Sequence, residues 1–194
     1  MIIGLTGPTG SGKTTVCDVA LELGFTVINC DDLAHELTNS GEPLAALVDE
    51  FGNKILNADG SLNRKMLAEA AFSDKNSTER LNNTVLPFVV AELKNILRKN
   101  EGKNILLDAP TLYESGADSL CDKVIAVIAD KSVRIERIIK RDNLSTFMAL
   151  LRIGAGKPDE FYQSKADIIL ENNDSAEQLS SLAGNLFKEL LKNE

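Results

Sequence analysis

The stretch Gly7-Pro8-Thr9-Gly10-Ser11-Gly12-Lys13-Thr14 decides the fold of this chain. It fits the pattern G-x-x-x-x-G-K-S/T at every fixed position. An apolar run at 2–6 precedes it and a helical pattern at 14–23 follows it, which is the context such a loop requires. The glycines let backbone N–H groups turn inward, and the helix N-terminus adds partial positive charge. A glycine-rich turn without a ligand is the alternative, but spacing and context together favour a phosphate-binding loop.

Further strands are predicted along the chain from short, nearly continuous apolar runs. They lie at 25–28, 104–107, 123–128 and 168–170. Runs of this kind are typical of strands that are covered on both faces, as in parallel sheets. We therefore predict an α/β fold: a P-loop NTPase three-layer sandwich with a parallel five-stranded sheet.

Between the second and third predicted strands, apolar residues recur at three- and four-residue spacing through 44–51, 65–72 and 81–97. This spacing predicts a helical insertion. Helices are also predicted at 131–141 and 175–192, whereas 142–165 has weak periodicity and looks mobile. The expected organisation is one domain, whose parts are the core (1–31, 99–131 and 166–194), a helical insertion (32–98) and the segment 132–165.

Composition limits the class of protein. The 194 residues carry a formal net charge of −8, which argues against nucleic-acid binding because that requires a basic surface. There is no apolar run long enough to cross a membrane and no signal-peptide pattern, so we expect a cytoplasmic protein without a membrane partner. Cys17, Cys30 and Cys121 form no zinc-type spacing and are expected to be buried thiols. A monomer or weak homo-oligomer is expected.

The phosphate loop assigns roles to its own residues. Lys13 is expected to span the β- and γ-phosphates of ATP, and Thr14 to offer its hydroxyl to Mg²⁺. No N-K-x-D-like guanine reader follows a later strand, which disfavours a GTPase. The predicted ATP-binding residues of this loop are Gly7, Gly10, Ser11, Gly12, Lys13, Thr14 and Thr15.

Two carboxylates are expected at the ends of predicted strands. Asp31 follows the second strand and Asp108 ends the third, and ligands of parallel sheets bind at the carboxyl ends of the strands. Asp31 is the candidate base for an acceptor hydroxyl, and Asp108 is the candidate Mg²⁺-shell carboxylate. The alternative role for Asp31, for its neighbour Asp32 and for Asp108 is helix capping or turn formation. Together with the phosphate loop, these carboxylates favour a kinase.

Arginines are concentrated on one predicted helix. Arg134, Arg137 and Arg141 recur at i, i+3 and i+7, so they share one face. Arginine suits phosphate because its planar guanidinium donates two parallel hydrogen bonds. The pattern indicates a lid helix that closes over ATP phosphates, and the alternative is a solvated face balanced by Glu136 and Asp142.

Beyond these patterns, the sequence resembles the dephospho-CoA kinase family over about residues 1–175. The resemblance rests on short motifs whose order and spacing agree, although each one is weak alone. They are Val27-Ile-Asn-Cys-Asp-Asp-Leu-Ala34, Ser40-Gly-Glu-Pro43 with Phe51-Gly52, Asp59-Gly-Ser-Leu-Asn-Arg64, Leu81-Asn82 with Pro87, Asp108-Ala-Pro-Thr-Leu-Tyr-Glu114, and Ala166-Asp167 with Asn172.

The resemblance implies ATP-dependent phosphorylation of the ribose 3′-hydroxyl of dephospho-CoA, the last step of coenzyme A synthesis, with Asp31 as base. It places acceptor binding in 32–98 and the lid in 132–165. The implied ATP-binding residues beyond the loop are Arg137, Arg141 and Asn172. The implied acceptor-binding residues are Asp31, His35, Arg64, Asp108, Pro110 and Glu114.

Several positions depart from the family pattern, chiefly in the predicted acceptor and lid contacts. His35 stands where the family has arginine, Leu86 where it has histidine, Gly156 where it has glutamine, and Tyr162 where it has a basic residue. His35 is a candidate for an acceptor phosphate or for a partly buried structural role. Two alternatives therefore stay open at this point: a kinase for another nucleotide or small hydroxyl acceptor, and an ATP-binding paralogue without transferase activity.

Overall fold

The computed structural model describes residues 1–192, and they form two compact units. The first unit contains residues 1–28, 102–112 and 118–192, and the second contains 29–101 and 113–117. Within residues 1–192, no helix combines the length and the apolar character needed to cross a membrane.

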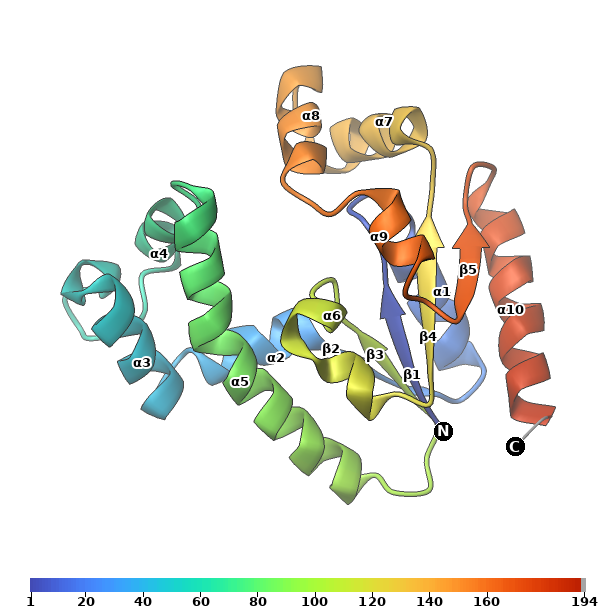
Figure 1. Ribbon diagram of the computed structural model, residues 1–194, viewed down its shortest axis with the longest axis horizontal. Helices are drawn as coiled ribbons and strands as arrows, with labels where there is room; N and C mark the ends of the chain where they lie inside the picture. Colours follow the sequence, from blue (N-terminus) through green and yellow to red (C-terminus); the bar gives the residue numbers. More distant parts are fainter. Residues whose placement is uncertain (193–194) are drawn as a thin grey trace. The chain divides into compact units, whose positions relative to one another are not determined.

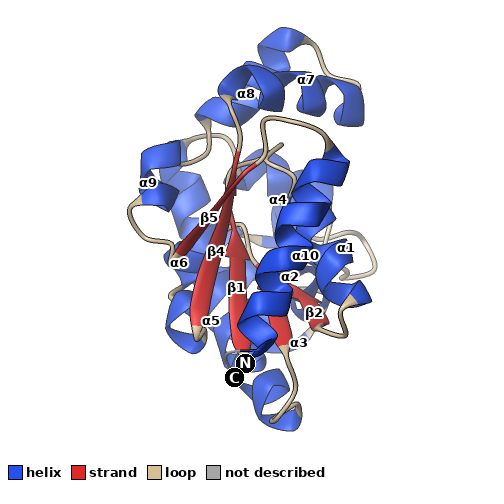
Figure 2. Ribbon diagram, turned by 90° about the vertical axis from the view of Figure 1, so that its right-hand side faces the viewer, coloured by secondary structure: helices blue, strands red, loops and turns tan. Residues whose placement is uncertain are grey.

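A five-stranded, all-parallel sheet forms the centre of the first unit, as the apolar runs predict. The strand order is β2-β3-β1-β4-β5. Figure 2 shows the strands in red, with helix α10 running beside them. The strands are β1 (Ile2–Thr6), β2 (Thr26–Asn29), β3 (Ile105–Asp108), β4 (Lys123–Ile128) and β5 (Ile168–Glu171).

The register of the sheet positions the site. In the central strand β1, Leu5 pairs with Asp108 of β3, and Thr6 pairs with Ala126 of β4. The phosphate loop begins directly after Thr6. Because the strands are parallel, the loop and Asp108 leave the sheet at the same edge.

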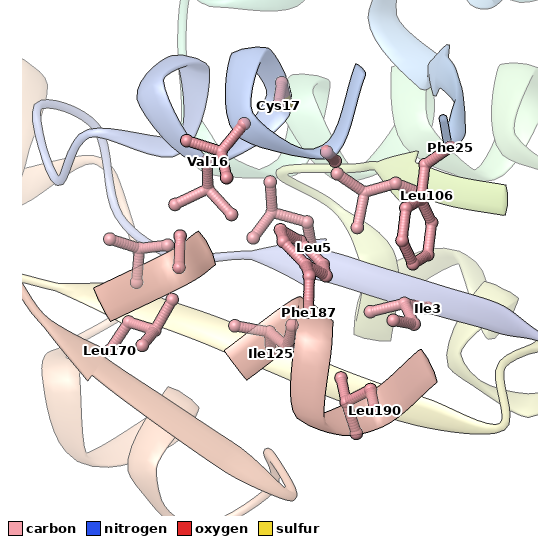
Figure 3. Packing of buried hydrophobic residues seen from close by; sticks show 14 of the residues in the cluster. Ile3, Leu5, Val16, Cys17, Phe25, Leu106, Ile125, Leu170, Phe187 and Leu190 are labelled. Carbon is pink, nitrogen blue, oxygen red and sulfur yellow. The ribbon is translucent and has the colours of Figure 1, made fainter. Parts of the chain in front are cut away.

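Two helices cover one face of this sheet: α1 (Lys13–Glu22) and α10 (Ala176–Lys192), which pack against each other (Figure 1). Figure 3 shows their apolar side chains meeting those of the strands. Phe187 of α10 is fully buried, and its ring centroid lies 5.0 Å from that of Phe25. Burying an aromatic or aliphatic side chain stabilises a fold by about 1.5–3 kcal/mol, so this layer anchors α1 and the loop that precedes it.

Three more helices belong to the first unit: α7 (Lys131–Asp142), α8 (Thr146–Gly154) and α9 (Asp159–Gln163). Helix α7 matches the predicted element. The weak periodicity of 142–165 did not predict α8 and α9. Ser145 caps α8 by accepting a hydrogen bond from the Met148 N–H, and Pro158 precedes the first turn of α9, so both helices have local start signals.

The second unit is helical. Its longest element, α5, packs against α2, α3 and α4, and buries Val85, Val89 and Leu93. The three predicted segments at 44–51, 65–72 and 81–97 lie in α3, α4 and α5. The elements are α2 (Cys30–Leu37), α3 (Gly41–Phe51), a 3₁₀ turn (Asn53–Ile55), α4 (Arg64–Ala71), α5 (Lys75–Lys99) and most of α6 (Leu112–Ser115). A second 3₁₀ turn (Ala117–Leu120) belongs mostly to the first unit.

Candidate active site

The phosphate loop joins β1 to α1, and its shape requires glycine at two positions. Gly7 has φ 139°, and a Cβ there would lie 2.2 Å from the carbonyl oxygen of Val127 on β4. Gly12 has φ 107°, and a Cβ there would lie 2.3 Å from Nδ2 of Asn172. Neither position tolerates a side chain. The close packing holds the loop in one curled conformation at the N-terminus of α1, where the N–H groups of the first turn have no intrahelical acceptors.

Lys13 lies against the same loop. Its Nζ donates hydrogen bonds to the carbonyl oxygens of Gly7, at 2.8 Å, and Pro8, at 3.4 Å. Thr14, next along the helix, is exposed. Ser11 is fully buried, and its Oγ has no hydrogen-bond partner. The loop and the start of α1 thus carry the Lys13 ammonium together with the hydroxyls of Ser11 and Thr14. All seven loop residues predicted to bind ATP belong to this one segment.

Asp108, at the end of β3, lies beside Cys17 of α1, the helix that follows the phosphate loop. The pKa of the Cys17 thiol is raised from 9.0 to about 12, mainly by burial and then by the charge of the neighbouring Asp108 carboxylate and a hydrogen bond with it. The Lys13 ammonium acts on the same thiol in the opposite direction. Lys13, Cys17 and Asp108 therefore form one cluster, which sequence reasoning missed because Cys17 fits the pattern of an ordinary buried residue.

The oxygen donors near the loop suit magnesium. A nucleotide-bound Mg²⁺ takes one or two protein oxygens and fills its octahedron with phosphate oxygens and water. Thr14 and Asp108 supply a hydroxyl and a carboxylate of this kind. Residues 1–192 contain no group of three or more His, Cys, Asp or Glu side chains that could hold a metal ion.

Pro110 follows Asp108 and is tied to the same edge of the sheet. Its carbonyl oxygen accepts a 3.4 Å hydrogen bond from Oγ1 of Thr6, and the Ala109 N–H donates to the carbonyl oxygen of Leu5 at 3.0 Å. These bonds fix the chain that leaves β3 beside the chain that leaves β1.

Asn172 connects the loop after β5 to the phosphate loop. It is buried, and its Nδ2 donates a 2.7 Å hydrogen bond to the carbonyl oxygen of Ser11. Arg137 of α7 donates to the carbonyl oxygen and Oδ1 of Asn172, at 3.0 and 3.2 Å, and to the carbonyl oxygen of Asp174 at 3.1 Å. Arg137 and Asn172, both predicted to bind ATP, thus form one hydrogen-bond network that ends on the phosphate loop.

The other arginines of the predicted phosphate-facing set have separate partners. Arg134 is 5% exposed and pairs with Asp159 of α9, its Nη2 lying 3.1 Å from Oδ1. Arg141 is exposed and pairs with Asp142 at 2.8 Å, and Arg152 of α8 pairs with the same carboxylate. The hydrogen bond from Arg141, followed by the charges of both arginines, lowers the pKa of Asp142. The alternative of a solvated arginine face is therefore wrong for Arg134, because its side chain is buried and paired with the Asp159 carboxylate.

In the second unit, Asp31 lies in the first turn of α2 and not at the end of a strand. Strand β2 ends at Asn29, whose Oδ1 accepts hydrogen bonds from the N–H groups of Asp31, at 2.9 Å, and Asp32, at 3.0 Å. The capping role considered for Asp31 and Asp32 is thus wrong, since Asn29 is the cap. An asparagine followed by two acidic residues is a helix-start signal that the sequence already contained.

The remaining predicted acceptor residues also lie in the second unit. His35 is exposed, so the partly buried role is wrong. Its carbonyl oxygen accepts a 2.7 Å hydrogen bond from Arg64, which also donates to Oδ1 of Asn39 at 2.7 Å. Arg64 thereby ties the start of α4 to the end of α2. Glu114 is exposed on α6.

Comparison with known proteins gives a consistent result. The sequence model of the dephospho-CoA kinase family matches residues 1–178. A dephospho-CoA kinase of Fusobacterium nucleatum is 39% identical over 179 residues, covering 92% of this chain and 93% of that protein.

Solved structures agree. A crystal structure of a Thermus thermophilus protein superposes with a TM-score of 0.81 at 31% identity, covering 98% of this chain and 97% of the other. A dephospho-CoA kinase from Campylobacter jejuni gives a TM-score of 0.73 at 27% identity, covering 99% and 98%. With the family model matching nearly the whole length, the chain belongs to the dephospho-CoA kinase family.

Proposed function

We propose that this protein transfers the γ-phosphoryl group of ATP to the ribose 3′-hydroxyl of dephospho-CoA, giving CoA and ADP. The observation that carries the proposal is the phosphate loop with Lys13 and Asp108 at one edge of the sheet, in a chain of the dephospho-CoA kinase family. The oxygen of the 3′-hydroxyl forms the new bond to the γ-phosphorus. The bond from the γ-phosphorus to the β,γ-bridging oxygen breaks, and its electron pair leaves with ADP.

The phosphate loop supplies charge neutralisation. Phosphoryl transfer depends on in-line positioning and on stabilising the charge spread over the phosphoryl oxygens. Lys13 can exchange its hydrogen bonds to Gly7 and Pro8 for bonds to the β- and γ-phosphates, while loop N–H groups hold the β-phosphate. When bound, Mg²⁺ would neutralise phosphate charge. Thr14 would hold it directly, and Asp108 directly or through water.

The base is assigned to Asp31. Its carboxylate would accept the proton of the 3′-hydroxyl as the oxygen attacks. Asp31 stands in the first turn of α2, where the helix dipole favours the ionised carboxylate. An ionised carboxylate can accept a hydrogen bond from the hydroxyl, which orients the oxygen for attack.

Acceptor binding is assigned to the insertion 32–98, with His35 and Arg64, and to Asp108, Pro110 and Glu114 near it in sequence. Residues 132–165 are assigned as the lid over ATP. Arg141 is assigned to ATP phosphate, for which it must leave Asp142. The cytoplasmic location and the monomeric or weakly oligomeric state stay predictions from the sequence.

The direct test is turnover by the purified protein with ATP, Mg²⁺ and dephospho-CoA, followed by chromatographic separation of CoA. We expect one CoA per ADP. AMP, adenosine and shikimate in place of dephospho-CoA test for another acceptor. Phosphorylation of one of these without CoA formation would refute the acceptor, and ATP binding without any transfer would refute the kinase activity.

A further inference from the structure

A groove on the second unit lies along the proposed acceptor-binding insertion, and Glu114 is its one lining residue with a role of its own so far. Its volume is about 480 Å³, within the range of small-molecule sites. All of its lining comes from α5 and α6, within one unit. The lining residues are Asn82, Asn83, Leu86, Pro87, Val90, Ala91, Lys94, Glu114 and Ser115.

The lining combines a neutral polar rim with an apolar wall. Leu86, Pro87 and Val90 form the apolar part, and the two asparagines offer both amide donors and amide acceptors. Lys94 and Glu114 are the charged members, and their charges cancel. A groove with no net charge fits an uncharged ligand better than a phosphate, which requires several donors or cations.

Pro87 adds a backbone feature. It stands in the interior of α5, and proline has no N–H to donate to the carbonyl oxygen four residues earlier, which is that of Asn83. Asn83 is exposed and lines the groove. The groove is therefore lined by a residue whose backbone carbonyl lacks its regular i+4 donor, and such a carbonyl is a suitable acceptor for an amide N–H.

The groove lies along α5, which belongs to the same unit as the proposed base Asp31. Helix α5 packs against α2, whose first turn contains Asp31, and both belong to the second unit. A ligand seated along α5 is thus held by the same compact unit as the proposed base.

We propose that this groove binds the pantetheine arm of the acceptor, an inference that rests on the proposed function. The arm is uncharged and has two secondary amides, a hydroxyl and a geminal dimethyl group. The amides match Asn82, Asn83 and the Asn83 carbonyl, and the dimethyl group matches the apolar wall. The groove thereby selects dephospho-CoA over a bare adenine nucleotide.

The test measures acceptor selectivity by binding. Isothermal calorimetry is run on the full chain with a non-hydrolysable ATP analogue filling the donor site, and dephospho-CoA and AMP as the titrants. Ala91→Trp fills the groove from an exposed position of α5. The matched control, Asn95→Trp, adds the same indole to the same helix outside the groove.

The wild-type protein and Asn95→Trp are expected to bind dephospho-CoA at least about tenfold more tightly than AMP. Ala91→Trp is expected to lose most of that preference, through weaker dephospho-CoA binding with AMP affinity unchanged. Asn83→Ala tests the side chain apart from the backbone. It should lose less of the preference for dephospho-CoA than Ala91→Trp, because the backbone carbonyl remains.

An Ala91→Trp protein that keeps the wild-type preference would overturn the proposal, and so would a wild-type protein without any preference. Neither result depends on turnover. A protein that binds the arm selectively but forms no CoA would refute the proposed function alone, so the two failures are distinguishable.

Discussion

Nδ2 of Asn172 donates a 2.7 Å hydrogen bond to the carbonyl oxygen of Ser11, although the two residues are 161 positions apart in the sequence. The bond is buried and joins the loop after the last strand to the loop after the first. Arg137 holds Asn172 from the other side. The phosphate loop is therefore positioned by residues that need not touch phosphate themselves.

Replacing Asn172 with alanine should loosen the phosphate loop. The carbonyl oxygen of Ser11 loses its buried donor and Arg137 loses an acceptor, which should lower the free energy of unfolding by about 1–3 kcal/mol. The KM for ATP should rise more than the KM for the acceptor. Chemical denaturation and steady-state kinetics measure both.

Asn173→Ala is the matched control for Asn172→Ala, since Asn173 is exposed and its Oδ1 accepts a hydrogen bond from the Asp130 N–H. It should leave the KM for ATP near the wild-type value. An equal rise in both variants would show that the loop after β5 matters only for general stability.

Lys13→Ala should remove a cation from the transferring phosphoryl group. Loss of one such electrostatic contact costs about 10²–10³ in kcat. The fold should persist, because the hydrogen bonds from the Lys13 ammonium to Gly7 and Pro8 lie within the loop itself. Rates are measured with saturating ATP and dephospho-CoA, and Lys140→Ala, an exposed lysine of α7, is the control. A Lys13→Ala enzyme with wild-type kcat would contradict the assignment.

Asp31→Asn should separate catalysis from ATP binding. The amide keeps the size of the side chain but accepts no proton, so kcat should fall by about 10²–10⁴ while ATP affinity is kept. Asp32→Asn, in the same helical turn and under the same Asn29 cap, is the comparison and should change little. Unchanged turnover in Asp31→Asn would show that another group receives the proton.

Cys17 should make stability fall at high pH. Its pKa is raised from 9.0 in the unfolded reference to about 12 in the folded protein, so the unfolded chain releases its proton first. The stabilising contribution is complete below pH 9 and is lost progressively between pH 9 and 12, by up to about 1.4 kcal/mol per pH unit.

The measurement for Cys17 is urea denaturation of the wild-type protein and Cys17→Ala between pH 8 and 10.5. The difference in unfolding free energy should shrink as pH rises. Cys121→Ala, at a less buried thiol, is the reference and should run parallel to the wild type. Parallel curves for all three proteins would exclude the Cys17 effect.

The sheet and the phosphate loop could be predicted because their signals are local. Ile2–Thr6, the glycine spacing and Lys13 specify a strand, a tight loop and a helix start within a few residues. The apolar runs of β3 and β4 identify buried strands in the same way. The identity of the acceptor was predicted from the family motifs, because no local pattern in the sequence specifies it.

What the sequence did not reveal depends on contacts between distant residues. The Arg134–Asp159 pair spans 25 positions, and no periodicity links its two members. The groove beside Pro87 combines α5 with Glu114 of α6, so it exists only after folding. Asn29 is the exception: its capping signal was local, but the two aspartates that follow it suggested the end of a strand.

Helix α7 contacts the phosphate loop and α9, both through Arg134, and this restricts how the proposed lid can move. A Cβ on Gly10 would lie 3.1 Å from the carbonyl oxygen of Arg134, so α7 packs directly on the phosphate loop. The Arg134 side chain also forms an ion pair with Asp159 of α9. The chain between these anchors turns at Asn143, which has φ 51°. We therefore expect the proposed lid to bend at Asn143 and within 155–158, with α8 moving as one piece once the Asp142–Arg152 ion pair breaks.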